Sequence, residues 1–219
     1  MRRVFVDPGA PQRDAIEEAA TWILRGGLVA LPTDTLYGLA ADPFSNAAVT
    51  RLFEAKGRPT ERALPLIAAD RAQVADHLGR LSPEGERLAA RFWPGPLTLL
   101  ITAPASVATA VTSGTGAVGV RVPADEVARL ICAACGQPIT ATSANISGEP
   151  ATADPGEVER SMGQRIDLLI DAGPTRGGAP STIVDVTGAS PTLVRAGAIP
   201  WEEIQRCLQN EPAPRAGQA

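Results

Sequence analysis

The chain has 219 residues, of which 44% are hydrophobic, and a formal net charge of −4. This length and apolar content allow a substantial buried core, so the sequence predicts a globular protein. The acidic balance argues against a protein whose main task is to hold nucleic acid on a broad basic face, but it leaves room for a local cationic pocket.

Helical and strand patterns alternate along the chain. The first helical pattern ends at Gly26-Gly27, and the second begins at Ser45, a good N-cap, and ends at Gly57. In chain order, we predict helices over 12–25, 45–57, 70–78, 82–93, 124–135, near 155–162 and after Pro200. Strands are predicted over 28–32, 64–68, 97–103, 118–122, 138–142, 167–171, 182–186 and 192–196.

This alternation is typical of an α/β protein with a mixed sheet. The sequence shows no internal repeat and no linker that would divide it, so we expect a single domain over residues 1–209. The segment NEPAPRAGQA (210–219) lacks apolar periodicity, and we expect it to form a disordered tail.

No part of the sequence directs the chain to a membrane or to an oxidising compartment. The stretch MRRVFVDPGAPQRD lacks an apolar run of signal-peptide length, and no segment approaches the ~18 apolar residues of a membrane helix. Three cysteines are too few for a disulfide framework. We therefore expect a cytoplasmic protein.

Two of the cysteines, Cys132 and Cys135, form a CxxC pair that could be a redox motif. They lie near the end of an apolar helical pattern, and no second CxxC and no histidine cluster accompanies them. We therefore interpret both as buried helix residues, as is common for free cysteine.

Several common catalytic signatures are absent from the sequence. The segment GTGAVG (114–119) satisfies G-x-G-x-x-G but leads into a strand, whereas a dinucleotide fingerprint must open a helix. There is no P-loop and no G-x-S-x-G. His77 is the only histidine, so a histidine triad and a His-rich metal site are excluded.

Small polar residues follow several predicted strands, where α/β folds commonly place ligand contacts. Each of these segments taken alone is also compatible with an ordinary turn. The candidates are Thr33, Asp34, Thr35 and Tyr37 in PTDTLYGLAADP (32–43), Ser143 and Asn145 in TATSANISG (140–148), and Ser181 after the glycine-rich stretch DAGPTRGGAP (171–180).

Cationic residues give a stronger signal. Arg121 in VGVRVP and Arg195 in LVRAGAIP each interrupt an apolar strand, where arginine needs a carboxylate or phosphate partner. For each arginine, the sequence is compatible both with a structural salt bridge and with a contact to a ligand. KGRPTERALP (56–65) adds Lys56, Arg58 and Arg62, either as a solvated run of charge or as one wall of an anion site.

Seven motifs of the sequence occur in a characteristic order: PTDTLYGL, KGRP, FWPGPLTLL, VGVRVP, PITATSANISG, STIVDV and LVRAGAI. Their order and approximate spacing resemble the threonylcarbamoyl-AMP synthase family, built on the YrdC-like domain, over about residues 12–206. The resemblance implies a YrdC-like α/β (mixed α+β) fold, with a twisted open mixed β-sheet flanked by helices around a concave cationic cavity. Because little sequence follows the domain, the chain is most similar to the short, single-domain form of the family.

The family condenses L-threonine, bicarbonate and ATP, with Mg²⁺ held through the ATP phosphates, to threonylcarbamoyl-AMP and pyrophosphate. The resemblance therefore implies an L-threonylcarbamoyladenylate synthase, a nucleotidyltransferase. A tRNA threonylcarbamoyl transferase complex would then modify adenosine 37 of tRNAs that read codons beginning with A. A weak direct contact with tRNA is also compatible with the cationic cavity.

The resemblance also assigns roles to residues. It implies that Lys56, Arg58, Ser143 and Asn145 are catalytic residues. It implies that the same four residues bind ATP together with Arg62 and Arg195. It implies that Thr35, Arg121 and Ser181 bind threonine, with Arg121 suited to a bidentate contact with the carboxylate. No protein metal ligand is implied.

Two positions depart from many relatives, which carry Asn at the position of Arg62 and His at that of Ile67. The family chemistry also suggests a lid, because a carbamoyl-adenylate must be protected from water. The glycine-rich loop around 173–180 is the candidate for this lid.

Two alternative functions stay open. One is a carbamoyl-adenylate-forming domain like that of hydrogenase maturation proteins, although the zinc-finger and acylphosphatase-like modules of those chains are absent from this sequence. The other is an RNA-binding or ribosome-associated module without catalysis, against which the acidic charge counts.

Overall fold

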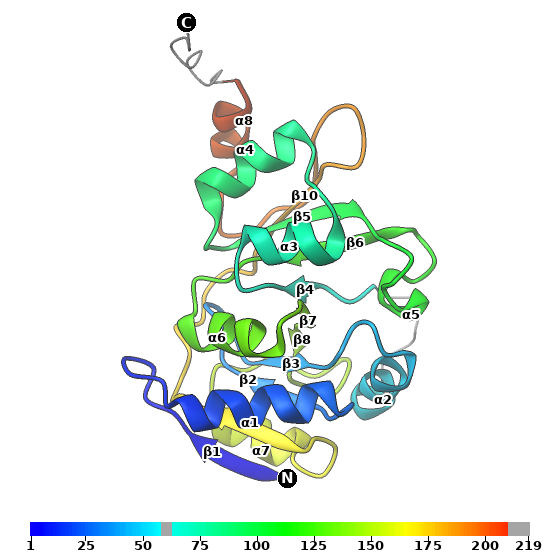
Figure 1. The fold of residues 1–219 in the computed structure, drawn as a ribbon. Coiled ribbons are helices and arrows are strands. Elements are labelled where there is room, and N and C mark those ends of the chain that lie inside the picture. The colour runs from blue at the N-terminus through cyan, green and yellow to red at the C-terminus, as the bar shows by residue number, and fades with distance from the viewer. Residues whose placement is uncertain (58–62, 210–219) are drawn as a thin grey trace, which may run out of the picture.

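Helices and strands alternate along the chain, and the α/β class is confirmed (Figure 1). The computed structural model describes residues 1–57 and 63–209. The helices are α1 (Arg13–Leu24), α2 (Asn46–Lys56), α3 (Arg71–Leu78), α4 (Pro83–Phe92), α5 (Thr109–Thr112), α6 (Glu126–Cys135), α7 (Pro155–Met162) and α8 (Trp201–Gln209). The strands are β1 (Arg2–Phe5), β2 (Val29–Leu31), β3 (Gly38–Ala40), β4 (Leu66–Ile67), β5 (Leu97–Thr102), β6 (Ala117–Arg121), β7 (Ile139–Thr140), β8 (Thr142–Ser143), β9 (Leu168–Asp171), β10 (Thr182–Asp185) and β11 (Thr192–Arg195).

The strands form two mixed sheets, whereas the sequence pattern alone suggests one. The first sheet has the order β1-β9-β2-β3-β8, and the second has the order β11-β10-β5-β6-β4-β7. Figure 1 shows the first sheet in the lower half of the molecule with α1 in front of it, and the second sheet in the upper half behind α3. The predicted disordered tail (210–219) lies outside the described residues.

Residues 139–143 join the two sheets. Ile139 pairs with Ile67 in the second sheet, and Ser143 pairs with Gly38 in the first. Between them, the Thr140 amide donates to the Ala41 carbonyl at 3.0 Å, and the Ala41 amide donates to Thr140 Oγ1 at 2.8 Å. One short segment therefore fixes the position of the two sheets relative to each other.

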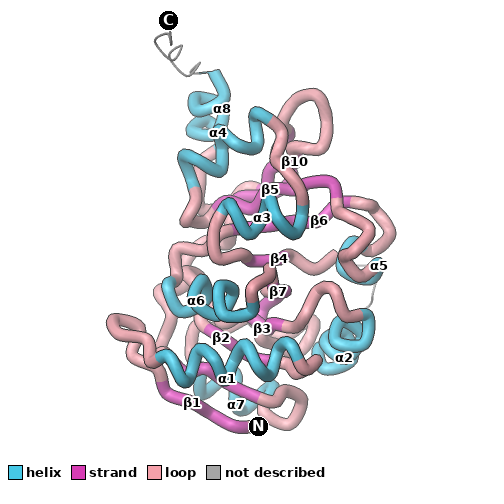
Figure 2. Tube along the Cα trace, viewed as in Figure 1, coloured by secondary structure: helices cyan, strands magenta, loops and turns pink. Residues whose placement is uncertain are grey.

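Two apolar cores pack around the sheets, and each takes side chains from both sheets. In Figure 2 the strands run through the middle of the molecule, and α1 and α6 cover one side of the first sheet. Ile23 of α1 and Ile131 of α6 are fully buried against Leu168 and Ile170 of β9. The second sheet packs its apolar face against α3, α4 and α8. None of the helices in these described ranges is long and apolar enough to cross a membrane.

The helix boundaries follow the capping signals in the sequence. Ser45 Oγ accepts a hydrogen bond from the Ala48 amide at 3.3 Å at the start of α2, and Gly57 ends that helix with a φ of 57°. This left-handed conformation is easily adopted only by glycine. The end of α2 is important for the site because it fixes where Lys56 lies.

The cysteines of α6 are buried, as predicted. Cys132 and Cys135 are both free thiols inside the same apolar core as Ile131. Burial raises the pKa of both thiols, that of Cys135 to about 12. These thiols therefore stay protonated at neutral pH, which is unsuited to a redox motif.

Candidate functional site

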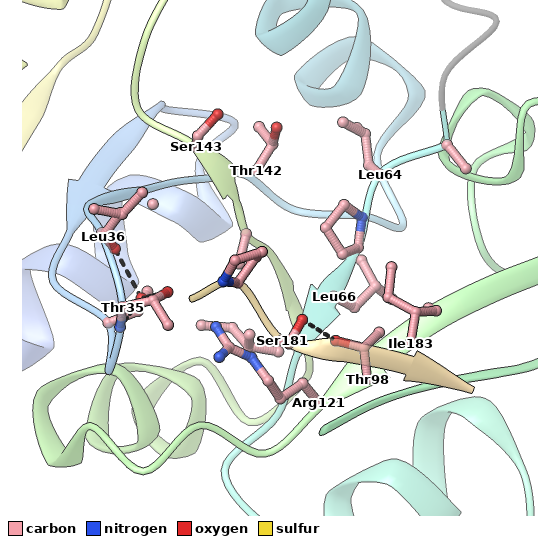
Figure 3. Close-up of a pocket in the computed structure, with 18 of the residues that line it drawn as sticks. Thr35, Leu36, Leu64, Leu66, Thr98, Arg121, Thr142, Ser143, Ser181 and Ile183 are labelled. Carbon is pink, nitrogen blue, oxygen red and sulfur yellow. Dashed lines mark hydrogen bonds between the residues drawn. The ribbon is translucent and has the colours of Figure 1, made fainter. Parts of the chain in front are cut away.

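A cavity of about 430 Å³ lies where the two sheets meet. Its walls come from segments that are far apart in the sequence: residues 33–38, 63–67, 141–143 and 180–183, together with parts of β5, β6 and β11. Figure 3 shows Thr35, Arg121 and Ser181 facing this space, with Ser143 at its rim.

Strand alternation in the second sheet forms the floor of the cavity. Successive side chains of a strand point to opposite faces. Thr98 and Leu100 of β5, and Gly119 and Arg121 of β6, therefore face the cavity. The side chains between them pack into the core on the other face, namely Leu97, Leu99, Val118 and Val120.

Arg121 is a buried cation in this floor. It is 9% exposed, and its Nη1 lies 2.9 Å from Asp34 Oδ1. The contact is an ion pair, but its geometry leaves both atoms without a hydrogen bond within the described part of the chain. Burial lowers the pKa of Arg121, and the charge of Asp34 opposes this shift. Arg121 therefore has a carboxylate neighbour on one side, and its side chain also lines the cavity, where an anion could contact the guanidinium group.

Arg195 brings a second guanidinium group to the same cavity from β11. Its Nη2 donates to the Ser181 carbonyl at 2.7 Å and to Ser181 Oγ at 3.1 Å. The charge of Arg195 contributes to the lowered pKa of Arg121, so the two cations interact. Two like charges facing one cavity are stabilised by an anion between them.

The threonines before β3 are held in a tight turn. Thr33 Oγ1 donates to the Leu36 carbonyl at 2.7 Å and lies 3.2 Å from Thr35 Oγ1. Both threonines line the cavity. The turn therefore presents hydroxyl groups opposite the arginine floor.

The glycine-rich loop is fastened to the same turn. The Thr35 carbonyl accepts from Thr175 Oγ1 at 2.8 Å and from the Gly177 amide at 2.9 Å. Tyr37, which is fully buried, donates its hydroxyl to the Gly173 carbonyl at 2.8 Å. Movement of this loop would therefore be transmitted directly to Thr35.

Lys56, Ser143 and Asn145 meet although they lie far apart in the sequence. Lys56 is 2% exposed, and its Nζ donates to the Asn145 carbonyl at 2.7 Å and to Asn145 Oδ1 at 3.2 Å. The same ammonium donates to the Ser143 carbonyl. Ser143 lines the cavity, whereas Lys56 and Asn145 do not. Lys56 and Asn145 therefore lie behind Ser143, farther from the cavity.

The structure thus brings together most of the residues predicted from the sequence. The predicted residues that line the cavity are Thr33, Thr35, Tyr37, Arg121, Ser143, Ser181 and Arg195. Lys56 and Asn145 support the rim at Ser143. The predictions for Arg58 and Arg62 lie outside the described residues.

Sequence reasoning assigned no role to Thr98, Gly119 or Ile183, which also line the cavity. Thr98 could have been found, because it is a polar residue at an alternate position of the apolar strand LTLLIT. Asp34 and Arg121 were both recognised as candidates, but their pairing was not predicted, since the two are far apart in the sequence. In the described ranges, no group of three or more His, Cys, Asp or Glu is placed to hold a metal ion.

The fold and the site define a mixed α/β protein with a cavity between two sheets that is lined by two arginines. The family model Sua5_yciO_yrdC, described as "Telomere recombination", matches residues 21–197. The chain therefore belongs to the Sua5/YciO/YrdC family.

Individual relatives agree with this assignment. The threonylcarbamoyl-AMP synthase of Pyrococcus abyssi is 42% identical over 201 residues, which cover 90% of this chain and 59% of the relative. The threonylcarbamoyl-AMP synthase of Bacillus subtilis is 37% identical over 194 residues, which cover 88% of this chain and 56% of the relative. A crystal structure of P. abyssi Sua5 complexed with L-threonine has a TM-score of 0.90 at 39% identity and covers 95% of this chain and 61% of that one. The chain thus spans less than two thirds of the length of these relatives.

Proposed function

We propose that the protein is an L-threonylcarbamoyladenylate synthase that condenses L-threonine, bicarbonate and ATP to threonylcarbamoyl-AMP and pyrophosphate. The observation that carries this proposal is the buried guanidinium group of Arg121 in the floor of a cavity that Arg195 also lines. The names of the two curated relatives and the threonine complex of P. abyssi Sua5 support it.

The proposed reaction needs several anions in one place. The threonine amine attacks bicarbonate to form a carbamate with loss of water, and the carbamate oxygen then attacks the α-phosphate of ATP, releasing pyrophosphate. Carboxylate, carbamate and triphosphate repel each other unless fixed cations lie between them. Arg121 and Arg195 supply two such cations from the described part of the chain.

Arg121 is proposed to grip the threonine carboxylate. Its planar guanidinium suits a bidentate contact with a carboxylate, and Asp34 holds it from one side. Thr35 and Ser181 would bind the same amino acid through their hydroxyl groups. The reaction requires no covalent enzyme intermediate, so the protein contributes mainly positioning and charge.

Ser143 and Arg195 are proposed to contact ATP from opposite walls of the cavity. Lys56 and Asn145 would act from behind Ser143, because the Lys56 ammonium holds the backbone carbonyls of the 143–145 loop. Arg58 and Arg62 are proposed as further ATP contacts. Mg²⁺ would enter with the ATP phosphates.

The loop at 173–180 is proposed as a lid over the reactive intermediate. Its hydrogen bonds to Thr35 would close it when threonine occupies the turn. Limited proteolysis of this loop should slow when ATP and threonine are both present. Equal cleavage with and without the substrates would count against a lid.

The product test uses ¹³C-labelled bicarbonate with ATP, Mg²⁺ and L-threonine. We expect mass spectrometry to find threonylcarbamoyl-AMP one mass unit heavier than with ordinary bicarbonate. If carbamoyl phosphate forms an adenylate and bicarbonate with threonine does not, the domain acts like that of the hydrogenase maturation proteins. If no adenylate forms and RNA binds with a steep salt dependence, the RNA-binding alternative is favoured.

The cellular role follows from the product. We propose that a tRNA threonylcarbamoyl transferase complex in the cytoplasm receives the adenylate and modifies adenosine 37 of tRNAs that read codons beginning with A. A weak contact of the cationic cavity with tRNA would assist this transfer.

A further inference from the structure

Thr98 is a polar side chain at a buried position of the cavity floor. It is 4% exposed and lies on β5, where the neighbouring Leu97 and Leu99 pack into the core. Its hydroxyl lies 2.8 Å from Ser181 Oγ, as the dashed line in Figure 3 shows. A buried hydroxyl needs such a partner, because an unpaired polar group is unfavourable away from water.

Ser181 is held by a second donor. Arg195 Nη2 lies 3.1 Å from Ser181 Oγ, and a guanidinium group can only donate hydrogen bonds. This contact occupies one of the two lone pairs of the serine oxygen. The direction of the Thr98–Ser181 hydrogen bond decides what happens to the other lone pair.

Whichever direction this hydrogen bond takes, one of the two hydroxyl hydrogens is left without a partner among the described residues, and the deeper burial of Thr98 favours leaving the Ser181 hydrogen. If Ser181 donated to Thr98, the buried Thr98 hydrogen would have no acceptor in the described part of the chain. If Thr98 donates to Ser181, its hydrogen is paired, and both lone pairs of Ser181 Oγ are occupied. The Ser181 hydrogen is then left to point into the cavity, which Ser181 lines.

We propose that Thr98 is a positioning residue that makes Ser181 a pure hydrogen-bond donor toward the ligand. The ligand atom that meets Ser181 must then be an acceptor, and the neighbouring Arg121 and Arg195 favour an anionic oxygen. Such an oxygen could belong to an amino-acid carboxylate or to a nucleotide phosphate. The inference rests on the proposed function for its two ligands, L-threonine and ATP.

The test compares Thr98→Val, which keeps the shape but removes the hydroxyl, with Thr98→Ser, which keeps the hydroxyl. Thr102→Val is the matched control, since Thr102 lies on the same face of β5 but is exposed outside the cavity. Calorimetric titration measures the Kd of L-threonine and of ATP separately. Steady-state kinetics with each substrate varied then separates KM from kcat.

We expect Thr98→Val to weaken binding of one ligand roughly five- to tenfold, the effect of one ordinary hydrogen bond, since Thr98 acts on the ligand only through Ser181. The ligand affected identifies the source of the acceptor oxygen. KM for that ligand should rise by a similar factor with kcat nearly unchanged, and Thr98→Ser should restore both values. Unchanged affinity for both ligands would overturn the proposal. Thr98→Ala replaces Thr98→Val if the latter lowers the melting temperature.

A second experiment combines Thr98→Val with Ser181→Ala. Because Thr98 acts through Ser181, adding Thr98→Val to Ser181→Ala should cost no further affinity. Losses that add fully would mean that Thr98 acts independently, and would overturn the proposal. Wild-type protein that binds ATP but not threonine would overturn the proposed function alone, since the ATP titrations still decide the role of Thr98. Binding of neither ligand would overturn both.

Discussion

At the scale of single residues, the site is defined by where an acidic chain places its cations. Arg121 and the more exposed Arg195 face one cavity, and Lys56 is buried behind its rim. Removing a charged side chain from water is unfavourable unless partners compensate, so such groups are rarely buried without a role. The proposed role of each differs, which allows the roles to be tested separately.

The Arg121→Ala substitution should affect threonine far more than ATP. Loss of a bidentate contact with a carboxylate should raise the KM for L-threonine by about a hundredfold, corresponding to ~3 kcal/mol, while the Kd of ATP stays within about threefold. Arg91→Ala, an exposed arginine of α4, is the control. Equal and mild effects on both substrates would reject the assignment of Arg121.

The Lys56→Met substitution should abolish turnover and weaken ATP binding, because it releases the 143–145 loop. Lys56 donates to oxygens of both Ser143 and Asn145, so its loss leaves buried carbonyls unpaired. The melting temperature should therefore fall by several degrees as well. If Lys56→Met bound ATP normally and melted like wild type, the loop-supporting role would be wrong.

At the scale of elements, the glycine-rich loop after β9 is coupled to the turn before β3. Thr175 Oγ1 donates to the Thr35 carbonyl at 2.8 Å. Thr175→Val should loosen this connection and let water reach the intermediate. We expect more hydrolysed adenylate per pyrophosphate released, measured by chromatography of the products. Thr192→Val on exposed β11 is the control, and an unchanged ratio in Thr175→Val would contradict the coupling.

The packing of α6 predicts the reactivity of the cysteines. Burial raises the pKa of Cys135 to about 12, so at pH 8 only about one thiol in ten thousand is ionised. Cys132 is shifted in the same direction by burial. In the native protein, iodoacetamide should label the partly buried Cys207 first, and Cys132 and Cys135 only after unfolding. Rapid labelling of Cys132 and Cys135 by iodoacetamide in the native protein would contradict this prediction and would support a redox role.

Local sequence patterns were sufficient to predict the longer elements and part of the site. The largely apolar stretch LTLLITA (97–103) and the capping residues Ser45 and Gly57 indicated β5 and α2 correctly. The strands β1 (RRVF), β3 (GLA) and β8 (TS) were missed, because none of them lies in a run of apolar and β-branched residues like those that indicated the other short strands. Helix α5 was missed because four residues are too few to show a helical repeat.

Contacts between distant segments could not be predicted in this way. Lys56 meets Asn145 across 89 positions of the sequence, and nothing local to either residue indicates the other. The division into two sheets likewise depends on the register of 139–143, which pairs with β4 and then with β3. Arg121 was identified as a cation in need of a partner, but only the fold shows that Asp34 is this partner.

At the scale of the whole molecule, two sheets that share their apolar cores meet at a cavity that neither could form alone. The second sheet supplies the arginine floor, and the first supplies the threonine turn and the rim at Ser143. Because residues 139–143 fix one sheet against the other, the distance between the amino-acid and nucleotide contacts is set by the fold. This arrangement explains how a chain of net charge −4 can present a cationic site.

The central claim is that this cavity joins threonine to ATP through bicarbonate. The most direct test measures pyrophosphate release from ATP and bicarbonate with L-threonine, with L-serine and with no amino acid. We predict release that depends on L-threonine, falls markedly with L-serine and is near background without an amino acid. Release that is the same under all three conditions, or absent with threonine, would contradict the account.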